Sequence, residues 1–225
     1  MSFILDPYRF ASVVELGCEW ASSPSVNAIR TESNLRFECD ASGSGTYGNV
    51  VSTNCLDNLG YYSVRSETVS GDNVGVGVGL YRGAWDASNS NSWVGDNSSS
   101  TDAIGAWVDT GLTYRNGIAL NGFGALAATD WQFAARKAAD RWRIWIRRDN
   151  GLWSNLPVQP GSPDPTLDQN PTFEVLFTSE NRLEFRASIT RTGATSARFV
   201  RLHPTAATTT GTVPSGFTAA KFILP

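Results

Sequence analysis

The chain has 225 residues, of which 41% are hydrophobic and 11% aromatic, and a formal net charge of −3. This composition provides enough apolar surface for one large β domain or two small domains, and it excludes a wholly disordered chain. The acidic balance argues against nucleic-acid binding, which usually shows a basic surface, and no apolar run is long enough to predict membrane insertion.

The N-terminal quarter predicts an arm followed by strands. Residues 1–9 are apolar and short, and they fit either an edge strand of the domain or an arm that docks on a partner. A strand is expected over residues 10–20, and a Ser/Pro turn over residues 22–25. Residues 34–40 alternate regularly between apolar and charged side chains, which predicts a strand with Phe37 on its buried face.

Residues 41–49 are rich in glycine and serine, and they predict a flexible loop. Two strands joined by a turn are then expected at 61–69 and 74–80. The second has the sequence VGVGVGL, which places valines on one face and glycines on the other. Glycine weakens a strand unless something must approach closely, so we expect a large aromatic side chain or another backbone over the glycine face.

The most polar segment, residues 86–102, carries Trp93 in its middle. Long loops rich in Ser, Asn and Asp either carry function or are merely solvated. Trp93 either stacks on the apolar face of a sugar ring or folds back onto the core. Trp85, Asn91, Trp93 and Asp96 combine flat rings with hydrogen-bonding side chains, and they are the candidate ligand-binding residues for a glycan.

The clearest strand pattern covers residues 141–148, where Trp142 and the isoleucines share one face while the arginines lie on the other. Asn150-Gly151 just beyond it is typical of a tight turn. Residues 129–140 give conflicting signals, because alanine richness and a capping box favour a helix whereas alternating large apolar residues favour a strand. We predict a strand, because a hairpin then closes naturally.

The C-terminal third predicts several more strands. Residues 172–178 and 182–187 are expected to form a hairpin, with the charged side chains of the second strand facing solvent. Further strands are expected at 198–202 and near 217–224, and the proline-rich residues 159–171 predict a loop.

About a dozen short strands and no reliable helix predict an all-β fold. We expect a two-sheet antiparallel β-sandwich with little or no helix, formed as a single domain by residues 10–225.

Several short motifs follow one another along the chain. They are Tyr61-Tyr62-Ser63-Val64, the valine-glycine strand, Trp93-Val94-Gly95, the glycine-rich residues 117–124, Asp130, Asn150-Gly151-Leu152-Trp153 and Pro214-Ser215-Gly216-Phe217. In this order they resemble the SPRY domain, a bent β-sandwich, over about residues 55–220, which implies a SPRY/concanavalin-like jelly roll. The chain departs from the family in the strand after Asp130, which carries Arg136 and Lys137 where the family usually has small apolar residues.

This resemblance also implies a function. SPRY domains are not enzymes as a class, and they bind peptides or proteins through loops at one edge of the sandwich. Trp-rich domains of this Ser/Asn/Gly-rich style resemble those of bacteriophage virion proteins, which implies a capsid or tail decoration, spike or fibre. The implied partners are other virion proteins and further copies of the chain, in a virion assembled in the host cytoplasm. Phe3, Ile4, Leu5 and Tyr8 are the candidate virion-anchoring residues.

Two other functions remain as alternatives. A glycan-binding module for host adhesion is compatible with a virion role. A glycoside hydrolase or other hydrolase is less favoured, because His203 is the one histidine and no serine or cysteine motif lies near it in the sequence. Glu180 and Glu184 have the separation of residues on one strand face, but they alternate with arginines, which is typical of a salt-bridged solvent face. We expect no catalytic residues and no cofactor.

The three cysteines, Cys18, Cys39 and Cys55, have no metal-ligand spacing and leave an odd thiol under any pairing. That pattern suits assembly in a reducing cytoplasm, and the N-terminus lacks the pattern of a signal peptide. No metal site is expected.

Overall fold

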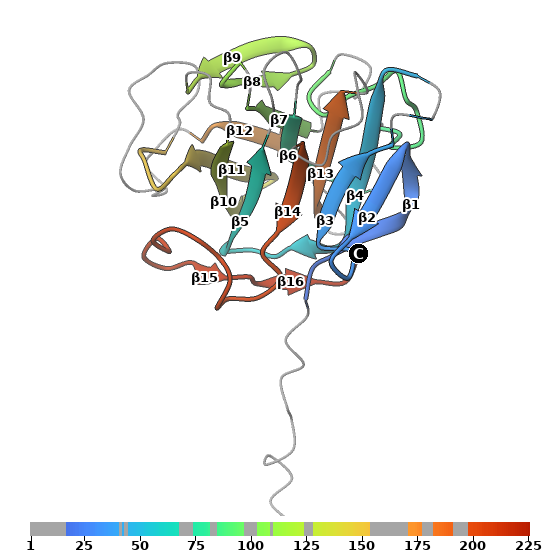
Figure 1. Cartoon of the computed structure of the whole chain (residues 1–225). Helices are drawn as coiled ribbons and strands as arrows, with labels where there is room; N and C mark the ends of the chain where they lie inside the picture. Colours follow the sequence, from blue (N-terminus) through green and yellow to red (C-terminus); the bar gives the residue numbers. More distant parts are fainter. Residues whose placement is uncertain are drawn as a thin grey trace, which may run out of the picture.

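The computed structural model describes residues 17–40, 42, 45–67, 74–81, 85–96, 103–108, 110–123, 128–153, 171–176, 182–190 and 198–225. Over these residues the chain is built from strands, in two sheets that pack face to face, and it contains no helix (Figure 1). It follows that these residues hold no helix of the length and apolarity needed to cross a bilayer.

The strands of the first sheet lie in the order β1 (Trp20–Val26), β4 (Tyr47–Leu56), β13 (Leu183–Thr190), β6 (Val74–Leu80), β7 (Ala103–Trp107), β8 (Leu112–Arg115) and β9 (Ile118–Gly122), with β16 (Phe222–Ile223) also on β4. The second sheet has the order β12 (Phe173–Leu176), β11 (Arg141–Arg148), β10 (Ala128–Ala138), β5 (Gly60–Glu67), β14 (Phe199–Leu202), β3 (Arg36–Cys39) and β2 (Ala28–Thr31), with β15 (Thr218–Ala219) on β5. Every described pair is antiparallel except β15 with β5. The predicted antiparallel β-sandwich is therefore confirmed.

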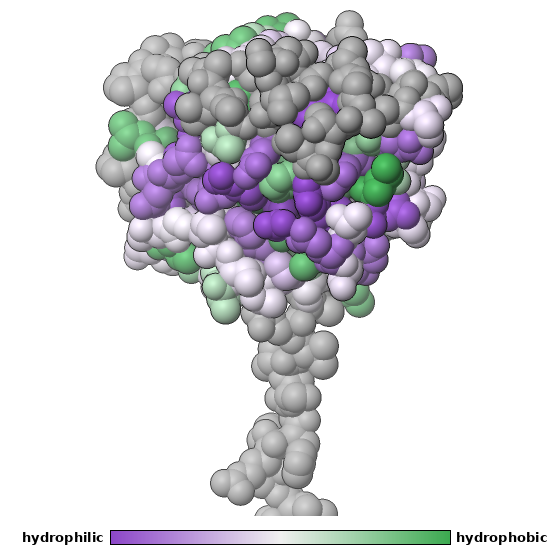
Figure 2. Space-filling model, viewed as in Figure 1, coloured by the Kyte–Doolittle hydropathy of each residue, from purple (hydrophilic) through white to green (hydrophobic). Residues whose placement is uncertain are grey.

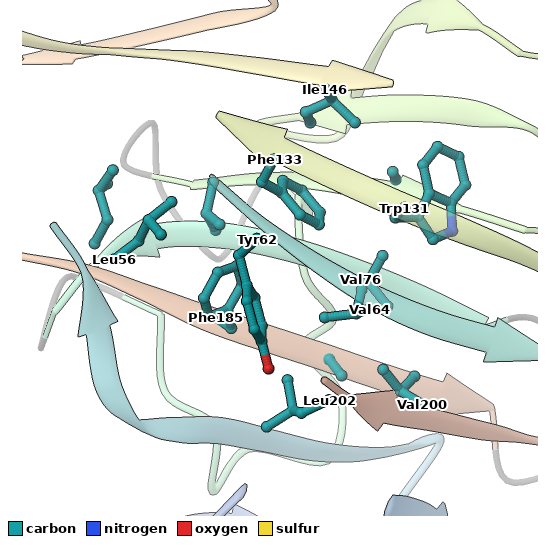
Figure 3. Packing of buried hydrophobic residues seen from close by; sticks show 14 of the residues in the cluster. Leu56, Tyr62, Val64, Val76, Trp131, Phe133, Ile146, Phe185, Val200 and Leu202 are labelled. Carbon is teal, nitrogen blue, oxygen red and sulfur yellow. The ribbon is translucent and has the colours of Figure 1, made fainter. Parts of the chain in front are cut away.

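Aromatic rings from both sheets fill the space between them (Figure 3). Tyr62 of β5 packs on Phe185 of β13 with ring centroids 4.6 Å apart, and Phe133 of β10 approaches the same ring at 5.8 Å. All three are buried. Burying a side chain of this size contributes roughly 1.5–3 kcal/mol, so this cross-sheet cluster is a main source of the sandwich's stability.

The β10–β11 hairpin confirms the strand predicted over residues 129–140 and excludes the helix. β10 pairs along its length with β5 on one side and β11 on the other. These two ladders satisfy its backbone groups, and they override the helix propensity of its alanines. The turn between the strands places Ala139 at φ +54°, and Asp149 and Asn150 at φ +47° and +59° form the tight turn after β11.

Two predicted hairpins are wrong. β5 lies in the second sheet and β6 in the first, and β12 and β13 are separated in the same way. Each connection therefore crosses from one layer of the sandwich to the other. Local alternation indicates that a strand exists, but the choice of partner depends on contacts far apart in the sequence.

Two predicted connections also belong to strands. Residues 47–49 of the expected glycine-rich loop begin β4, the strand that contacts β1, β13 and β16. Residues 22–25, expected as a turn, lie within β1 at a point where its pairing with β4 shifts. These residues resemble connections in the sequence because they include few large apolar side chains. In the structure β1 is an edge strand, and Gly48 and Asn49 of β4 lie beneath other chain segments.

The glycine face of β6 is covered as expected. A Cβ added to Gly75 would lie 2.6 Å from the Trp107 ring, and one added to Gly77 would collide with the Ile104 carbonyl oxygen and the Val94 side chain. Both the aromatic side chain and the backbone contact that the glycines predict are present.

The outer face of the second sheet is partly covered and partly polar. Its covered part is an apolar cluster, here called the outer cluster, of Tyr61, Ala134, Trp145 and Trp153 with Phe217 and Ala219 packed on it. In the view of Figure 2, hydrophilic residues form a band across the middle of the molecule, over the region where Figure 1 draws β5, β14 and β3.

Three arginines of this polar part lie side by side on adjacent strands. Arg201 is directly opposite Arg36 on one side and Arg65 on the other. Such like charges would repel, but acidic residues alternate with them. The ion pairs are Arg201–Glu32 at 2.6 Å, Arg36–Glu38 at 3.2 Å, Arg65–Glu67 at 3.2 Å and Arg65–Asp130 at 3.6 Å. The polar band is therefore a salt-bridged surface.

Candidate functional site

The segment that carries the predicted ligand-binding residues folds down on the outer face of the first sheet. Trp85 is 5% exposed and packs on Val51 and Ala87. Asp96 is 4% exposed, and its side chain accepts a hydrogen bond from the Trp93 backbone N–H at 3.2 Å. These two residues are therefore placed against the sheet and not on the surface.

Trp93 is half-buried and meets two rings edge to face, Trp107 at 5.2 Å and Tyr114 at 5.4 Å. Asn91 is exposed on a turn. The structure thus does not gather Trp85, Asn91, Trp93 and Asp96 into one open platform. Their ligand-binding role stays a prediction, and Trp85 lines the pocket described next. The candidate anchoring residues Phe3, Ile4, Leu5 and Tyr8 lie outside the described residues.

A pocket of about 260 Å³ opens on the outer face of the first sheet, beside Trp85. We call it the bulge pocket. Its walls come from β1, β4, β13, the segment after β6 and the C-terminal segment. The lining residues are Ala21, Ser23, Pro24, Val51, Ser52, Thr53, Tyr81, Trp85, Glu184 and Pro225.

An irregularity in the β4–β13 pairing forms one side of this pocket. Val51 pairs with Arg186 and Cys55 with Glu184, so three residues of β4 lie opposite the single residue Phe185. A bulge of this kind interrupts the ladder and bends the strand. The Phe185 N–H donates instead to the Ser52 hydroxyl at 2.9 Å, so the bulge leaves that buried donor satisfied.

A second bulge lies directly across β4. Trp20 of β1 pairs with Ser52 and Ser25 pairs with Val50, so four residues of β1 span one residue of β4. Ser23 and Pro24 belong to this excursion and line the pocket. The bulge of β4 and the bulge of β1 therefore meet at the same stretch of β4, and the pocket lies there.

A buried ion pair lies at the inner end of the pocket. The Arg186 Nε is 2.7 Å from a Glu184 carboxylate oxygen, and its NH2 donates to the Leu80 carbonyl at 2.6 Å. The same guanidinium lies 5.1 Å from the centre of the Trp85 ring. Glu184 is among the residues that line the pocket, and Arg186 is not.

The expectation that Glu184 and Arg186 face solvent is wrong, since they are 4% and 0% exposed. They do point away from the main core, but both are buried there, and the Arg186 guanidinium lies over the Trp85 ring. Gly79 permits this, because a Cβ there would lie 2.5 Å from the Arg186 guanidinium carbon. The glycine face of β6 was the available signal that this side of the sheet is covered, but the register of β13 on β6 is not visible in the sequence.

The surroundings of the pocket also change the acidity of Cys55. Burial, and secondarily the charge of Glu184, raises the pKa of this thiol to about 12. The thiol therefore stays protonated and is a poor nucleophile. Trp85 Nε1 is likewise buried and has no hydrogen-bond partner in the part of the chain that the structure describes.

Sequence analysis missed the partner of His203. Ser63 Oγ lies 2.7 Å from His203 Nδ1, and it also accepts the Thr210 N–H at 2.8 Å. Ser63 is 0% exposed, so a substrate has no access to its hydroxyl. Burial lowers the pKa of His203, and the nearby Asp130 charge opposes this shift. The arrangement fits a neutral imidazole that accepts from Ser63 and helps hold the C-terminal segment.

No cluster of three or more His, Cys, Asp or Glu side chains with the geometry of a metal site occurs among the described residues.

No protein-family model and no curated protein sequence matches the chain. Among solved structures, a carbohydrate-binding module, CBM66 from Bacillus subtilis, matches over 84% of this chain and 93% of the module. The sequence identity is 10% and the TM-score is 0.33, so this likeness supports no conclusion about function.

Proposed function

We propose that the chain is a non-enzymatic structural component of a bacteriophage particle, a capsid or tail decoration, spike or fibre whose SPRY-like sandwich serves attachment or recognition. Its proposed partners are other virion proteins and further copies of itself, in a virion assembled in the host cytoplasm. The observation that supports this proposal is that residues from separate SPRY-like motifs lie together in space.

Three aromatic residues from separate SPRY-like motifs meet in the outer cluster. Tyr61, Trp153 and Phe217 are far apart in the sequence, yet all three belong to this cluster. Tyr61 meets Trp153 edge to face at 6.2 Å, and Phe217 meets Trp145 at 6.4 Å. Motifs that match a family by chance have no reason to converge in space, so their convergence supports the resemblance and the virion role inferred from it.

The roles of the buried ionisable groups support the non-enzymatic part of the proposal. His203 is engaged with a buried serine, and Glu184 with a buried arginine. A general acid or base needs access to the proton that it transfers, and the contacts of these two side chains are structural.

A glycan-binding module for host adhesion is the second candidate, and the bulge pocket favours it. One wall is aromatic and aliphatic, with Trp85 and Val51, and another is polar, with Tyr81 and Glu184. Sugar rings have the same two characters, an apolar C–H face and a hydroxyl edge. The two proposals are compatible in a virion protein that contacts the host surface.

The composition of purified particles tests the virion role. Particles of the source phage would be banded on a density gradient, washed in high salt and analysed by quantitative peptide mass spectrometry. We expect peptides of this chain in a fixed ratio to the major capsid or tail proteins. Recovery of the chain only in the soluble fraction of the lysate would contradict the proposal.

A further inference from the structure

We propose that the segment between β14 and β15 opens as a unit while the two sheets stay intact, and that protonation of His203 promotes this opening. We call the segment, residues 204–217, the strap (Figure 1). The inference concerns a conformational change of the chain itself, and it does not depend on the proposed virion role.

The strap lies on the second sheet without entering the core. Every one of residues 203–219 is half-buried or exposed, so the strap adds no fully buried side chain to the sandwich. Phe217 provides an apolar contact with the outer cluster, where it meets the Trp145 ring at 6.4 Å. Segments with few buried apolar contacts open at a lower free energy than core strands do. Opening of the strap is therefore expected to require less free energy than unfolding of the sheets.

Side chains of β5 hold the middle of the strap by hydrogen bonds. The Thr210 N–H donates to Ser63 Oγ at 2.8 Å, and the Thr210 carbonyl accepts from the Tyr61 hydroxyl at 2.6 Å. Ser63 Oγ is also 2.7 Å from Nδ1 of His203, the residue just before the strap. Tyr61 and Ser63 are two residues apart on one strand, so both side chains lie on its outer face. One buried hydroxyl, that of Ser63, thus joins the start of the strap to its middle.

A second attachment is at Thr212. Its N–H donates to the side chain of Asn150 at 2.9 Å, and its carbonyl accepts from the Arg147 guanidinium. Thr210 and Thr212 are two residues apart in the same stretch of chain. Release of one attachment therefore removes a constraint on the other, and we expect the strap to open as a unit.

The state of His203 decides whether the Ser63 hydroxyl is satisfied. Ser63 Oγ accepts the Thr210 N–H, so its own O–H donates to Nδ1 when the imidazole is neutral. A protonated imidazole carries hydrogen on both nitrogens and cannot accept. Ser63 is 0% exposed, so its O–H then loses its acceptor without gaining water, which is unfavourable. Opening the strap admits water, and protonation of His203 therefore favours the open form.

Charged groups on three strands act on the imidazole. Burial disfavours its protonation most, the Arg201 charge of β14 and the Arg65 charge of β5 also oppose it, and the Asp130 charge of β10 favours it. The net effect lowers the pKa of His203 below 6.5. The strap itself brings no charge, because residues 204–220 contain no ionisable side chain. Histidine is also the side chain that ordinarily titrates near neutral pH, so His203 is the group that links the strap to pH.

The direction of the pH dependence follows from this lowered pKa. In the open form the imidazole reaches water and regains its ordinary pKa of 6.5. Below pH 6.5 the open form therefore binds more protons than the closed form, and the opening constant rises by at most about tenfold per pH unit until the closed-state pKa is reached. Burial raises the pKa of the neighbouring Tyr62 well above 10, so that hydroxyl stays neutral over this range.

The test is hydrogen–deuterium exchange of the full chain, read by mass spectrometry at pH 7.5 and 5.5. The amides of Thr210 and Thr212 report on the strap, and those of the β10–β11 hairpin report on the sandwich. Dividing the wild-type exchange rate by that of a variant at the same pH cancels the intrinsic pH dependence of amide exchange. The ratio then reports the difference in opening between the two proteins.

The main variant is His203→Asn, whose amide oxygen can accept from Ser63 as Nδ1 does but does not titrate. Its matched control is Ser215→Asn, which places the same side chain on an exposed residue of the strap. Asp130→Asn removes the carboxylate that acts on the imidazole. Circular dichroism checks that each variant is folded, and His203→Gln replaces His203→Asn if that variant is not.

We expect the ratio of wild type to His203→Asn at both strap amides to rise several-fold from pH 7.5 to 5.5, and by at most about tenfold per pH unit. The ratio to Ser215→Asn should stay constant, and the rise should persist when Asp130→Asn replaces the wild type. In the wild type, the strap amides should be less protected than the hairpin at both pH values.

Three results would overturn the inference. Equal protection of strap and hairpin would show that the strap opens only when the whole chain unfolds. A constant ratio to His203→Asn, or a pH dependence that only Asp130→Asn abolishes, would remove His203 from the mechanism. A pKa of 6.5 or higher in the native chain would do the same without any variant, and it can be read from the imidazole C–H signals in NMR because the chain has one histidine.

Discussion

Buried polar side chains in this protein act mainly by holding segments in place. Ser63 links His203 to the Thr210 backbone, and Ser52 replaces the ladder partner that the β4 bulge removes. An unsatisfied buried donor or acceptor costs about 1–3 kcal/mol, so each of these residues matters for stability out of proportion to its size. None of these partners is adjacent in sequence, so the residue types alone gave no indication of their roles.

The His203 contact predicts a pH dependence of stability. Burial lowers the pKa of His203 below its ordinary value of 6.5. At pH values between the pKa of His203 in the folded chain and 6.5, the unfolded chain binds more protons than the folded one. The contribution of the neutral imidazole to the free energy of unfolding is therefore complete above about pH 6.5 and decreases as the pH falls toward the folded pKa. Urea unfolding at pH 7.5 and 5.5 should show a larger loss of stability for the wild type than for His203→Gln. The same loss in both proteins would show that another group is responsible.

The close approach at Gly77 predicts a large effect of a single methyl group. Gly77→Ala would push a Cβ into the Ile104 carbonyl oxygen, and the backbone of β7 would have to move. Overpacking of this kind typically costs about 1–3 kcal/mol. Gly17→Ala is the control, because its nearest neighbour, the Pro204 carbonyl oxygen, is 4.0 Å away. Thermal unfolding should separate the two variants clearly, and equal melting temperatures would contradict the close approach.

Single elements of the fold could be predicted well where the alternation is strong. β3, β6, β10 and β11 match their predicted ranges, because each buries a regular set of apolar residues on one face. β4 was not predicted at all, and its start was assigned to a loop, because Gly48 and Asn49 are typical loop residues although other segments cover them. The predicted partner strands of β5 and β12 were wrong, because strand pairing in a sandwich depends on contacts between residues that are distant in sequence.

The site was predicted less well than the fold, for a related reason. Trp85 was selected, because an aromatic residue beside a polar segment is visible in the sequence. Ser23 and Glu184 were not, since the pocket exists only where bulges in two different strands coincide. Bulges depend on the register of neighbouring strands, which one sequence does not specify.

Arg147 joins β11 to the C-terminal segment and predicts a local destabilisation. Its guanidinium lies 4.4 Å from the centre of the Trp153 ring and donates to the Tyr61 hydroxyl and the Thr212 carbonyl. Lysine lacks the planar fork that makes these contacts together, so Arg147→Lys should cost about 1–3 kcal/mol.

Arg143→Lys provides the comparison for that prediction. Arg143 is on the same face of β11, but its ion pair with Glu174 is partly exposed, and such pairs contribute roughly 0–1 kcal/mol. Urea unfolding and limited proteolysis of the C-terminal segment should both separate the two variants. If Arg147→Lys resembles Arg143→Lys in both, the segment is held by other contacts.

At the scale of the whole molecule, two eight-stranded sheets in the described residues share one core, and both outer faces carry covered regions. The bulge pocket is on the first sheet, whereas the outer cluster and the salt-bridged band are on the second. The bulge pocket and the outer cluster therefore occupy opposite faces of the sandwich. Substitutions in the pocket can consequently be examined without disturbing the outer cluster.

The packed core predicts that the thiols are protected in the native protein. Cys18, Cys39 and Cys55 are all buried, and burial raises the pKa of Cys18 and of Cys55 to about 12. Iodoacetamide at pH 8 should leave the native protein unlabelled and add three groups to the chain in urea, as measured by intact mass. Rapid labelling of the native protein would show that the sandwich opens readily.

Immunogold labelling of intact, purified particles tests the central claim most directly, because it locates the chain in the particle. We expect label on the capsid or on the tail of the particles, at the same place in each. Particles without label, with the chain left in the soluble fraction of the lysate, would contradict the virion role.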